Sequence, residues 1–316
     1  MNRQVKIFVA GQHGMVGSAI KRSLMNHGFE NIIGLSSKEL DLRNQHDVDQ
    51  FIKFHKPEIV IDAAARVGGI MANQSYPYQF LMDNMLMQNN LIHSSHQHGV
   101  NKFIFLGSSC IYPRLAPQPL REDSLLTGPL ESTNEWYAIA KISGVKACES
   151  IRNQFGKDFV SLMPTNLYGP NDNFDLDTSH VLPAMIRKFH EAKVQGHQPV
   201  VLWGTGTPKR EFLHVDDLAE AVLFAVENKL PENLYNIGTG KDCSIQELAL
   251  LIQQAVGHKG PIEWDHSKPD GTPRKLMDVS KMHSLGWKHE IALNKGVFTT
   301  YQWFLDHINS YKKVSI

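Results

Sequence analysis

The sequence predicts an α/β fold built on a doubly wound parallel sheet, and two observations lead to this prediction. Short apolar runs alternate with longer amphipathic stretches through the first half of the chain, as strands alternate with helices. The first apolar run, Val5–Ala10, leads into glycines spaced GxxGxxG at Gly11, Gly14 and Gly17. Such glycines let the backbone approach a pyrophosphate held at the following helix N-terminus. We therefore expect a Rossmann-type sheet, with a smaller α/β substrate-binding domain towards the C-terminus.

The composition limits the kind of protein that this chain can be. Its 316 residues carry 32 basic and 32 acidic side chains, so no net charge favours nucleic acid or an anionic membrane as a partner. We expect no signal peptide and no membrane span, because no apolar run approaches the roughly 20 residues that cross a bilayer. The three cysteines are too scattered for a disulfide framework or a zinc site. We therefore expect a cytoplasmic protein without a bound metal.

The other elements follow in order from the hydrophobic pattern. Strands are predicted at Ile32–Leu35, Ile59–Asp62, Phe103–Leu106, Phe159–Met163, Val200–Trp203 and Leu234–Ile237. Helices are predicted near Gln45–Phe54, Tyr78–Gln97, Tyr137–Lys141, His180–Lys193, Asp217–Glu227, Ser244–Val256 and Lys295–Tyr311. Ser179 should cap one of these helices, and Ser244 with Glu247 should form a capping box on another. We place a dinucleotide-binding domain at residues 1–170, with a strand and helix near 210–240 returning to it, and the substrate domain mainly at 171–316.

The end of the second strand bears on which dinucleotide is bound. A site for NAD usually carries a carboxylate about 20 residues beyond the glycines, where it accepts from the ribose 2′-hydroxyl. Here the chain reads Ser36-Ser37-Lys38, and Glu39 and Asp41 come only later. Hydroxyls and an ammonium tolerate a 2′-phosphate better than a carboxylate does. The sequence therefore favours NADP, while NAD stays an alternative if Lys38 is only a solvated loop charge.

The chemistry is expected in residues 103–141 and at one later histidine. The strand Phe103–Leu106 ends in the small residues Gly107-Ser108-Ser109-Cys110, and Tyr137 and Lys141 follow, four residues apart on one helix face. Because a nearby positive charge lowers the pKa of a phenol, this pair would make a proton donor for a carbonyl oxygen that receives a hydride. His180 should be neutral, because the dipole at a helix N-terminus lowers its pKa.

These residues stand in motifs that resemble those of the GDP-L-fucose synthase family, within the extended short-chain dehydrogenase/reductase superfamily. The resemblance covers essentially the whole chain. Its motifs are Gly14–Ile20, Val67–Ile70, Leu106–Pro113, Tyr137–Lys141, Pro164–Pro170, His180 and Arg210–Asp217. The superfamily shares the glycine loop and the YxxxK pair, whereas Ser-Ser-Cys with the later histidine is far narrower.

The resemblance implies an NADPH-dependent, bifunctional enzyme. It would epimerise C3 and C5 of GDP-4-keto-6-deoxy-D-mannose and then reduce C4 to give GDP-L-fucose. Ser108 and Tyr137 would hold the C4 oxygen, with Lys141 supporting Tyr137. Cys110 would act as base and His180 as acid in the epimerisations. The resemblance also implies a homodimer, formed through the helices at Tyr78–Gln97 and Tyr137–Lys141.

The resemblance further implies two sets of binding residues. The cofactor contacts would be Gly11, Gly14, Met15, Val16, Gly17, Ser36, Ser37, Lys38, Asp41, Leu42, Leu106, Gly107, Ser108, Ser109, Lys141, Pro164, Thr165, Asn166, Leu167 and His180. The GDP moiety would meet Lys188, Trp203, Arg210 and Asp278. An indole can pack against guanine, and a guanidinium suits a diphosphate.

Two alternative functions stay open at this point. A GDP-L-colitose synthase would act on the 3-deoxy analogue and epimerise C5 only. A nucleotide-sensing protein on the same scaffold would catalyse nothing. The complete set of Ser108, Tyr137 and Lys141 favours an enzyme over a sensor.

Overall fold

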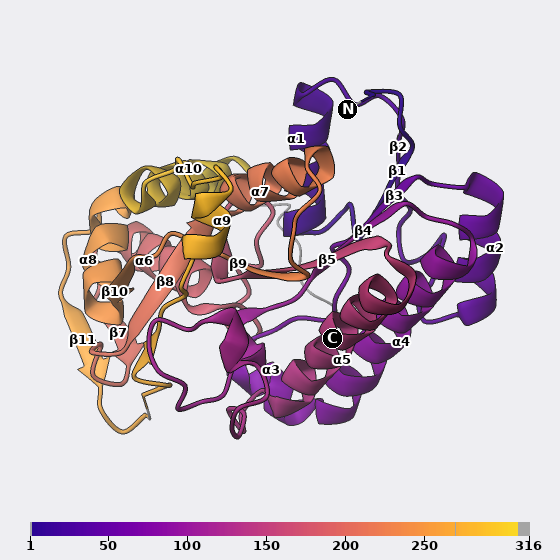
Figure 1. Ribbon diagram of the computed structural model, residues 1–316. Helices are drawn as coiled ribbons and strands as arrows, with labels where there is room; N and C mark the ends of the chain where they lie inside the picture. The colour runs from indigo at the N-terminus through magenta and orange to yellow at the C-terminus, as the bar shows by residue number, and fades with distance from the viewer. Residues whose placement is uncertain (1, 269, 309–316) are drawn as a thin grey trace.

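The computed structural model describes residues 2–268 and 270–308 (Figure 1). The helices are α1 (Met15–Asn26), α2 (Gln45–His55), α3 (Ile70–Ser75), α4 (Pro77–Gln97), α5 (Glu135–Phe155), α6 (Val181–Val194), α7 (Val215–Glu227), α8 (Ile245–Val256), α9 (Ser280–Ser284) and α10 (Leu293–Asp306), with 3-10 turns η1 (Ser109–Ile111) and η2 (Glu122–Ser124). The strands are β1 (Ile7–Ala10), β2 (Ile32–Ile33), β3 (Ile59–Asp62), β4 (Lys102–Leu106), β5 (Asp158–Pro164), β6 (Asn166–Tyr168), β7 (Val200–Trp203), β8 (Lys209–His214), β9 (Leu234–Ile237), β10 (Asp242–Ser244), β11 (Ile262–Asp265) and β12 (Arg274–Lys275).

A six-stranded sheet in the order β2-β1-β3-β4-β5-β9 forms the centre of the larger part of the molecule. Every neighbouring pair in it is parallel. In Figure 1, α1 and α7 lie on one face of this sheet, and α2, α4 and α5 lie on the other. Each face packs into its own apolar core. The predicted doubly wound α/β fold is confirmed, and the carboxyl ends of its strands meet at one edge, where such sheets bind ligands.

The segment after β8 returns to this sheet. Strand β9 pairs with β5, from Ser161 opposite Leu234 to Pro164 opposite Ile237. Helix α7 lies beside α1, where Ser23 donates to Glu220 at 2.8 Å and Arg22 forms an ion pair with Asp216 at 2.5 Å. Residues from distant parts of the sequence thus complete both the sheet and one helical layer.

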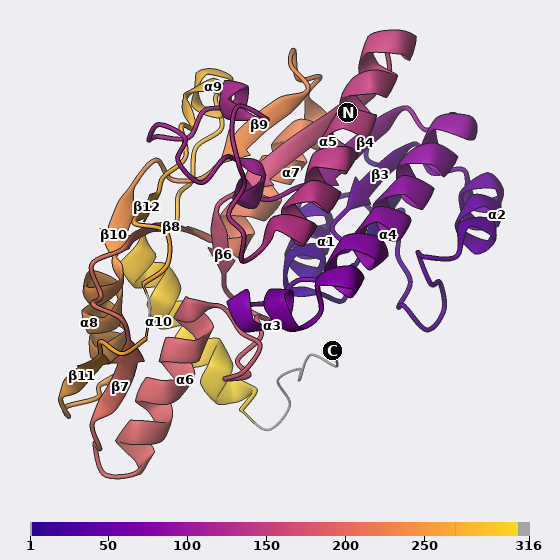
Figure 2. The same cartoon turned by 90° about the horizontal axis from the view of Figure 1, so that it is seen from below.

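The smaller part of the molecule is assembled around β8. Strands β10 and β12 flank β8, β6 also pairs with it, and β7 and β11 form a separate parallel pair. Figure 2 shows α6, α8 and α10 gathered around these strands, at the end of the molecule away from α2 and α4. A third apolar core joins these helices to β7 and β8. None of the helices within residues 2–268 and 270–308 is both long and apolar enough to cross a membrane.

Most predicted elements are found within a few residues of their expected bounds, and the differences have local causes. Strand β2 stops at Ile33, because the Gly34 carbonyl accepts from the Gln12 side chain at 2.7 Å instead of extending the sheet. Helix α6 begins at Val181, so His180 and not Ser179 is its N-cap residue. The capping box of Ser244 and Glu247 is confirmed. Helix α10 ends at Asp306, and the last predicted helical residues, 309–311, lie outside the described chain.

Candidate active site

The glycine loop between β1 and α1 is shaped to bring backbone close to a ligand. Gly11 has a φ of +79°, and a Cβ there would lie 2.7 Å from the Ala63 carbonyl oxygen. A Cβ at Gly17 would collide with the backbone of Gly11, so the helix can begin directly behind the loop only with glycine there. Gly14 caps α1 without a side-chain hydrogen bond, and the first turn carries no acidic residue. The helix N-terminus is therefore suited to the pyrophosphate of a dinucleotide.

The loop after β2 presents hydroxyl and ammonium groups, while its carboxylates are engaged elsewhere. The Ser36 amide and hydroxyl both donate to Glu39, at 2.8 and 2.7 Å. Asp41 accepts three hydrogen bonds from the Arg43 guanidinium. Ser37 and Lys38 are exposed. A pocket of about 280 Å³ adjoins this strand end, lined by Gln12, Lys21, Ile32, Ile33, Gly34, Leu35, Phe51 and His55. These features fit an adenosine ribose that carries a 2′-phosphate.

Several predicted cofactor residues also hold the two parts of the molecule together. The Thr165 hydroxyl and the Asn166 amide both donate to the Glu211 carbonyl, at 3.2 and 2.8 Å. Leu167 packs against the core beside α1 and α7, and the Leu42 side chain packs against the core on the other face of the sheet. These side chains are committed to structure, so a cofactor would meet chiefly their backbone.

Tyr137 and Lys141 both lie on α5 above the end of β4, but the lysine does not bond to the phenol. Lys141 is 2% exposed, and its Nζ donates to the Leu106 carbonyl at 2.9 Å. The ammonium stands 5.9 Å from the centre of the Tyr137 ring. Burial raises the pKa of Tyr137, and Cys110 and Asp62 raise it further. The expectation that Lys141 lowers this pKa is therefore wrong for the protein alone, although a phenol that keeps its proton suits a proton donor.

Ser108 and Cys110 occupy the turn that follows β4. The Cys110 backbone amide donates to the Ser108 hydroxyl at 3.4 Å, which orients the Ser108 side chain at the start of η1. Cys110 is 5% exposed, and burial raises the pKa of its thiol. Lys275 is the strongest influence in the opposite direction, followed by Ser108 and Lys141. The ease with which this thiol ionises thus depends on a lysine that the sequence analysis did not identify.

Lys275 interacts electrostatically with both the Cys110 thiol and Arg210. It lies on β12, directly opposite Arg210 of β8. Burial lowers the pKa of Lys275, and Cys110 opposes that effect. The basic pair Arg274-Lys275 was the available signal in the sequence, but only the electrostatic influence that Lys275 and Cys110 exert on each other links the two residues.

His180 lies at the N-terminus of α6, directly after the chain segment that contacts the Val67–Ile70 motif. Its ring is exposed, yet the protein packed around it lowers its pKa, so the neutral imidazole is favoured. Desolvation lowers the His180 pKa, whereas the sequence led us to expect this effect from the helix dipole. The Gly69 amide donates to the Thr178 carbonyl at 3.1 Å, and Phe80, whose ring lies edge-on to Tyr137, touches the neighbouring Gly68. The Val67–Ile70 motif therefore connects the chain before His180 with α5.

Three of the four residues predicted to meet GDP, Lys188, Trp203 and Arg210, lie on α6, β7 and β8. Trp203 is 58% exposed, and the Lys188 ammonium donates to the Val201 carbonyl at 3.2 Å. Burial lowers the pKa of Arg210, while Asp270 and Glu131 raise it. Asp270 accepts from the Thr205 amide at 2.9 Å, two residues after Trp203.

Asp278 does not belong to this group. Its carboxylate accepts from the Ser280 amide at 2.9 Å at the start of α9, and its own amide donates to the Leu120 carbonyl. The structure thus places Asp278 just before α9, and its assignment to the GDP site stays a prediction. Asp270 is the carboxylate that lies with Trp203 and Arg210, because the Gly204–Gly206 turn folds towards it.

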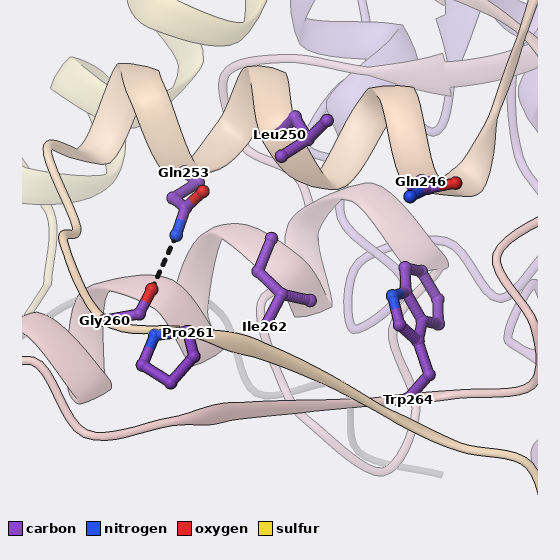
Figure 3. Close-up of a pocket in the computed structure, with 7 residues that line it drawn as sticks. All are labelled: Gln246, Leu250, Gln253, Gly260, Pro261, Ile262 and Trp264. Carbon is purple, nitrogen blue, oxygen red and sulfur yellow. Dashed lines mark hydrogen bonds between the residues drawn. The ribbon is translucent and has the colours of Figure 1, made fainter.

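A pocket of about 310 Å³ lies between α8 and the segment that contains β11. Figure 3 shows its lining, Gln246, Leu250, Gln253, Gly260, Pro261, Ile262 and Trp264, with Gln253 bonded to the Gly260 carbonyl. It contains none of the predicted catalytic or binding residues. The candidate active site is instead the edge of the six-stranded sheet that β4, η1, α5 and β12 enclose.

Comparisons with known proteins agree with this geometry. Residues 7–238 match the model of the NAD dependent epimerase/dehydratase family. GDP-L-fucose synthase 1 of Arabidopsis thaliana is 55% identical over 97% of this chain and 95% of the relative. The chain belongs to the GDP-L-fucose synthase branch of this family.

Two further comparisons add detail to that membership. The structure of a GDP-L-fucose synthetase from Naegleria fowleri bound to NADP superposes with a TM-score of 0.91, at 30% identity over 99% of this chain and 96% of that one. GDP-L-colitose synthase of Yersinia pseudotuberculosis is 40% identical over 97% of this chain and 100% of the relative. The colitose enzyme is thus the more distant of the two curated relatives described.

The dependence of Cys110 on Lys275 can be measured directly. Lys275→Met removes the charge that most opposes the raised thiol pKa, so alkylation of Cys110 by iodoacetamide should slow and its pH profile should move to higher pH. Peptide mass spectrometry would follow Cys110 separately from Cys148 and Cys243. Lys281→Met is the matched control, because Lys281 pairs with Glu232 and Glu122. An unchanged Cys110 profile in Lys275→Met would show that Lys275 does not act on the thiol.

Proposed function

We propose that this protein epimerises C3 and C5 of GDP-4-keto-6-deoxy-D-mannose and then reduces C4 with NADPH, forming GDP-L-fucose. The observation that carries the proposal is a buried thiol placed beside a tyrosine–lysine pair. A reductase that leaves its stereocentres untouched needs only the pair. Cys110 influences the pKa values of both Tyr137 and Lys141, and the Lys141 ammonium stands 5.9 Å from the centre of the Tyr137 ring, which supports one shared site. Membership among the GDP-L-fucose synthases supports both the sugar nucleotide and the sequence of steps.

One oxyanion position serves both reactions. The protons on C3 and C5 are each α to the C4 ketone, so removing either of them moves negative charge onto the C4 oxygen. Ser108 and Tyr137 would donate hydrogen bonds to that oxygen while the charge develops. In the reductive step, when NADPH is bound and supplies a hydride to C4, the same Tyr137 hydroxyl gives its proton to the oxygen. The raised pKa of Tyr137 favours this step, because the phenol is protonated at neutral pH.

Inversion at a carbon requires proton removal on one face and delivery on the other. We assign removal to Cys110 and delivery to His180. Lys275 makes ionisation of the buried thiol easier, and Lys141 adds to its effect. His180 approaches from the chain segment that precedes α6, whereas Cys110 approaches from the end of β4. Because Cys110 and His180 belong to different parts of the molecule, they can act on opposite faces of a sugar bound between the two parts.

The binding of the two nucleotides divides between the two parts of the chain. We infer that residues 1–170, with the returning segment near 210–240, hold NADP through the glycine loop and the Ser36–Lys38 turn. The remainder of 171–316 holds GDP, through Trp203, Lys188 and Arg210, with Asp270 in place of Asp278. The absence of a carboxylate free to bond a ribose 2′-hydroxyl at Ser36–Lys38, among the described residues, supports NADP over NAD.

We also infer that the protein is a cytoplasmic homodimer. Exposed apolar side chains cluster on α4 and α5, with Tyr78 69%, Leu86 40%, Trp136 45% and Ile139 37% exposed. Pairing of these two helices with their copies would form a four-helix contact and remove that apolar surface from water.

Product identification tests the function. The purified protein should convert GDP-4-keto-6-deoxy-D-mannose to GDP-L-fucose with NADPH, and more slowly with NADH at equal concentration. NMR of the product distinguishes this sugar from its epimers. A parallel incubation with the 3-deoxy analogue gives the matched comparison. Efficient turnover of the 3-deoxy sugar alone would identify a colitose synthase, and no oxidation of NADPH with either sugar would reject the enzymatic proposal.

Two substitutions should separate the two half-reactions. Tyr137→Phe should reduce C4 at least about 100-fold more slowly, because the proton donor is lost, while exchange of the C3 and C5 protons with solvent continues in part. Cys110→Ser should slow that exchange about 100-fold or more, because a serine hydroxyl ionises far less readily than a thiol. Cys243→Ser is the control thiol and should leave exchange unchanged. Normal exchange in Cys110→Ser would remove Cys110 from the role of base.

A further inference from the structure

Asp62 ends the central strand β3, beneath the helix that carries the tyrosine–lysine pair. In the sheet register it stands between Ala10 of β1 and Phe105 of β4, and Phe105 stands opposite Ser161 of β5. Side chains at this level point to the α4 and α5 face, because Ala10 and Phe105 both belong to the core on that side. Asp62 is therefore a carboxylate placed in the apolar layer under α5.

This carboxylate is fully buried and only half satisfied. Asp62 is 0% exposed, and its Oδ1 accepts from the Ala64 amide at 3.1 Å. Its Oδ2 has no hydrogen-bond partner among the described residues. Burial raises the pKa of Asp62 to about 6. The positive charge of Lys141 acts in the opposite direction and lowers this pKa. A carboxyl with this pKa is mostly ionised at neutral pH, so a negative charge sits inside the molecule.

Lys141 is the positive charge that acts on the Asp62 carboxylate. Its Nζ donates to the carbonyl of Leu106, the residue after Phe105, and lies 4.7 Å from the centre of the Phe105 ring. No carboxylate within the described chain forms an ion pair with Lys141 at 4 Å or less. Burial lowers the pKa of Lys141, and Asp62 is the largest influence that raises it. The two buried charges thus act on each other through the apolar layer around Phe105, where electrostatic attraction is screened little.

The other groups that face this pair are few. From α5 come Tyr137 and Cys148, and from η1 comes Cys110, on which Lys275 acts in turn. The side chains contributed by α4 and β5, Gln88 and Ser161, carry no charge. Asp62 is the one carboxylate that influences Tyr137, Lys141 and Cys148 alike within the described residues.

We propose that Asp62 is a positioning residue for the Tyr137–Lys141 pair: its buried carboxylate keeps Lys141 charged and seated on the Leu106 carbonyl, and keeps Tyr137 in its protonated form. This inference rests on the proposed reduction, in which Tyr137 gives its proton to the C4 oxygen. Asp62 touches neither substrate nor cofactor in this scheme. It acts by charge alone, across the layer that separates the sheet from α5.

The decisive variant is Asp62→Asn, which keeps the shape and removes the charge. Without the carboxylate, the pKa values of Lys141 and Tyr137 both fall. Both changes therefore move the alkaline limb of the pH profile for reduction to lower pH. We expect that limb, measured as kcat/KM for NADPH oxidation against pH, to fall by about one pH unit. Ser161→Ala, in the same row of the sheet and on the other side of Phe105, is the uncharged control and should leave the limb in place.

A purely structural role predicts a different outcome. Because burial raises the pKa of Asp62, ionisation of this group opposes folding above its unfolded pKa near 4, and removing the charge should not destabilise the protein at pH 7.5. Asp62→Asn should therefore melt at the same temperature as the unmodified chain or higher. Equal melting with an unmoved alkaline limb would overturn the proposal. A melting temperature of Asp62→Asn that lies far below that of the unmodified chain at pH 7.5, with the difference closing at pH 5, would also overturn it, because stability would then depend on the carboxylate as a structural group.

The inference can be separated from the proposed function. If the unmodified chain reduces no GDP-4-keto-sugar, the proposed function fails, and the ionisation of Tyr137 is followed without substrate. Ultraviolet difference titration between the unmodified chain and Tyr137→Phe isolates the tyrosinate signal of that one residue. The same comparison is then made between Asp62→Asn and the double variant Asp62→Asn/Tyr137→Phe. In this pair the Tyr137 tyrosinate signal should appear at lower pH. An identical titration in both backgrounds would show that Asp62 does not act on Tyr137.

Discussion

The hydrogen bond from the Lys141 ammonium to the Leu106 carbonyl fixes the geometry on which the site depends. It ties the first turns of α5 to the last residue of β4, a strand in the middle of the parallel sheet. Gly144, one turn further on, lets the helix approach, since a Cβ there would collide with the Phe105 ring. With α5 held at this distance, Tyr137 lies over the strand end from which Ser108 and Cys110 project. A helix placed further away would separate the phenol from the thiol.

The electrostatics of the candidate site in the free protein favour the neutral forms of its proton-transfer groups, with charged groups behind them. Burial raises the pKa values of Tyr137 and Cys110 and lowers that of His180, so all three tend towards their neutral forms. The charges of Lys141, Asp62 and Lys275 lie behind them. This arrangement keeps proton donors protonated until a ketone arrives, while Lys275 makes the thiol easier to ionise than its burial alone would allow.

Local patterns in the sequence were sufficient to predict the elements that carry the chemistry. Alternating strands and helices, the GxxGxxG loop and the four-residue spacing of Tyr137 and Lys141 depend on neighbours in the chain, and the parallel sheet is found as predicted. The choice between Asp270 and Asp278 shows what such reasoning leaves open. Both aspartates flank the same short strand, and only the contact of the Gly204–Gly206 turn with Asp270 distinguishes them.

Lys275 and Asp62 were missed for a similar reason. Lys275 lies 165 positions beyond Cys110 in the chain and reaches it only because β12 pairs with β8. Asp62 ends a run of apolar residues and reads as an ordinary strand end, because its burial under α5 depends on sheet order. The Tyr137 pKa was predicted in the wrong direction, since spacing on a helix gives proximity and says nothing about desolvation. Long-range pairing and burial are the two quantities that sequence patterns do not contain.

The central claim is that one site inverts two carbons and reduces a third. The most direct measurement is a single incubation of the protein with GDP-4-keto-6-deoxy-D-mannose and unlabelled NADPH in deuterium oxide, followed by NMR of the purified product. Epimerisation through an enolate predicts deuterium at C3 and C5, since both protons come from solvent, with ordinary hydrogen at C4 from the cofactor. A reduced product that carries ordinary hydrogen at both C3 and C5 would contradict it.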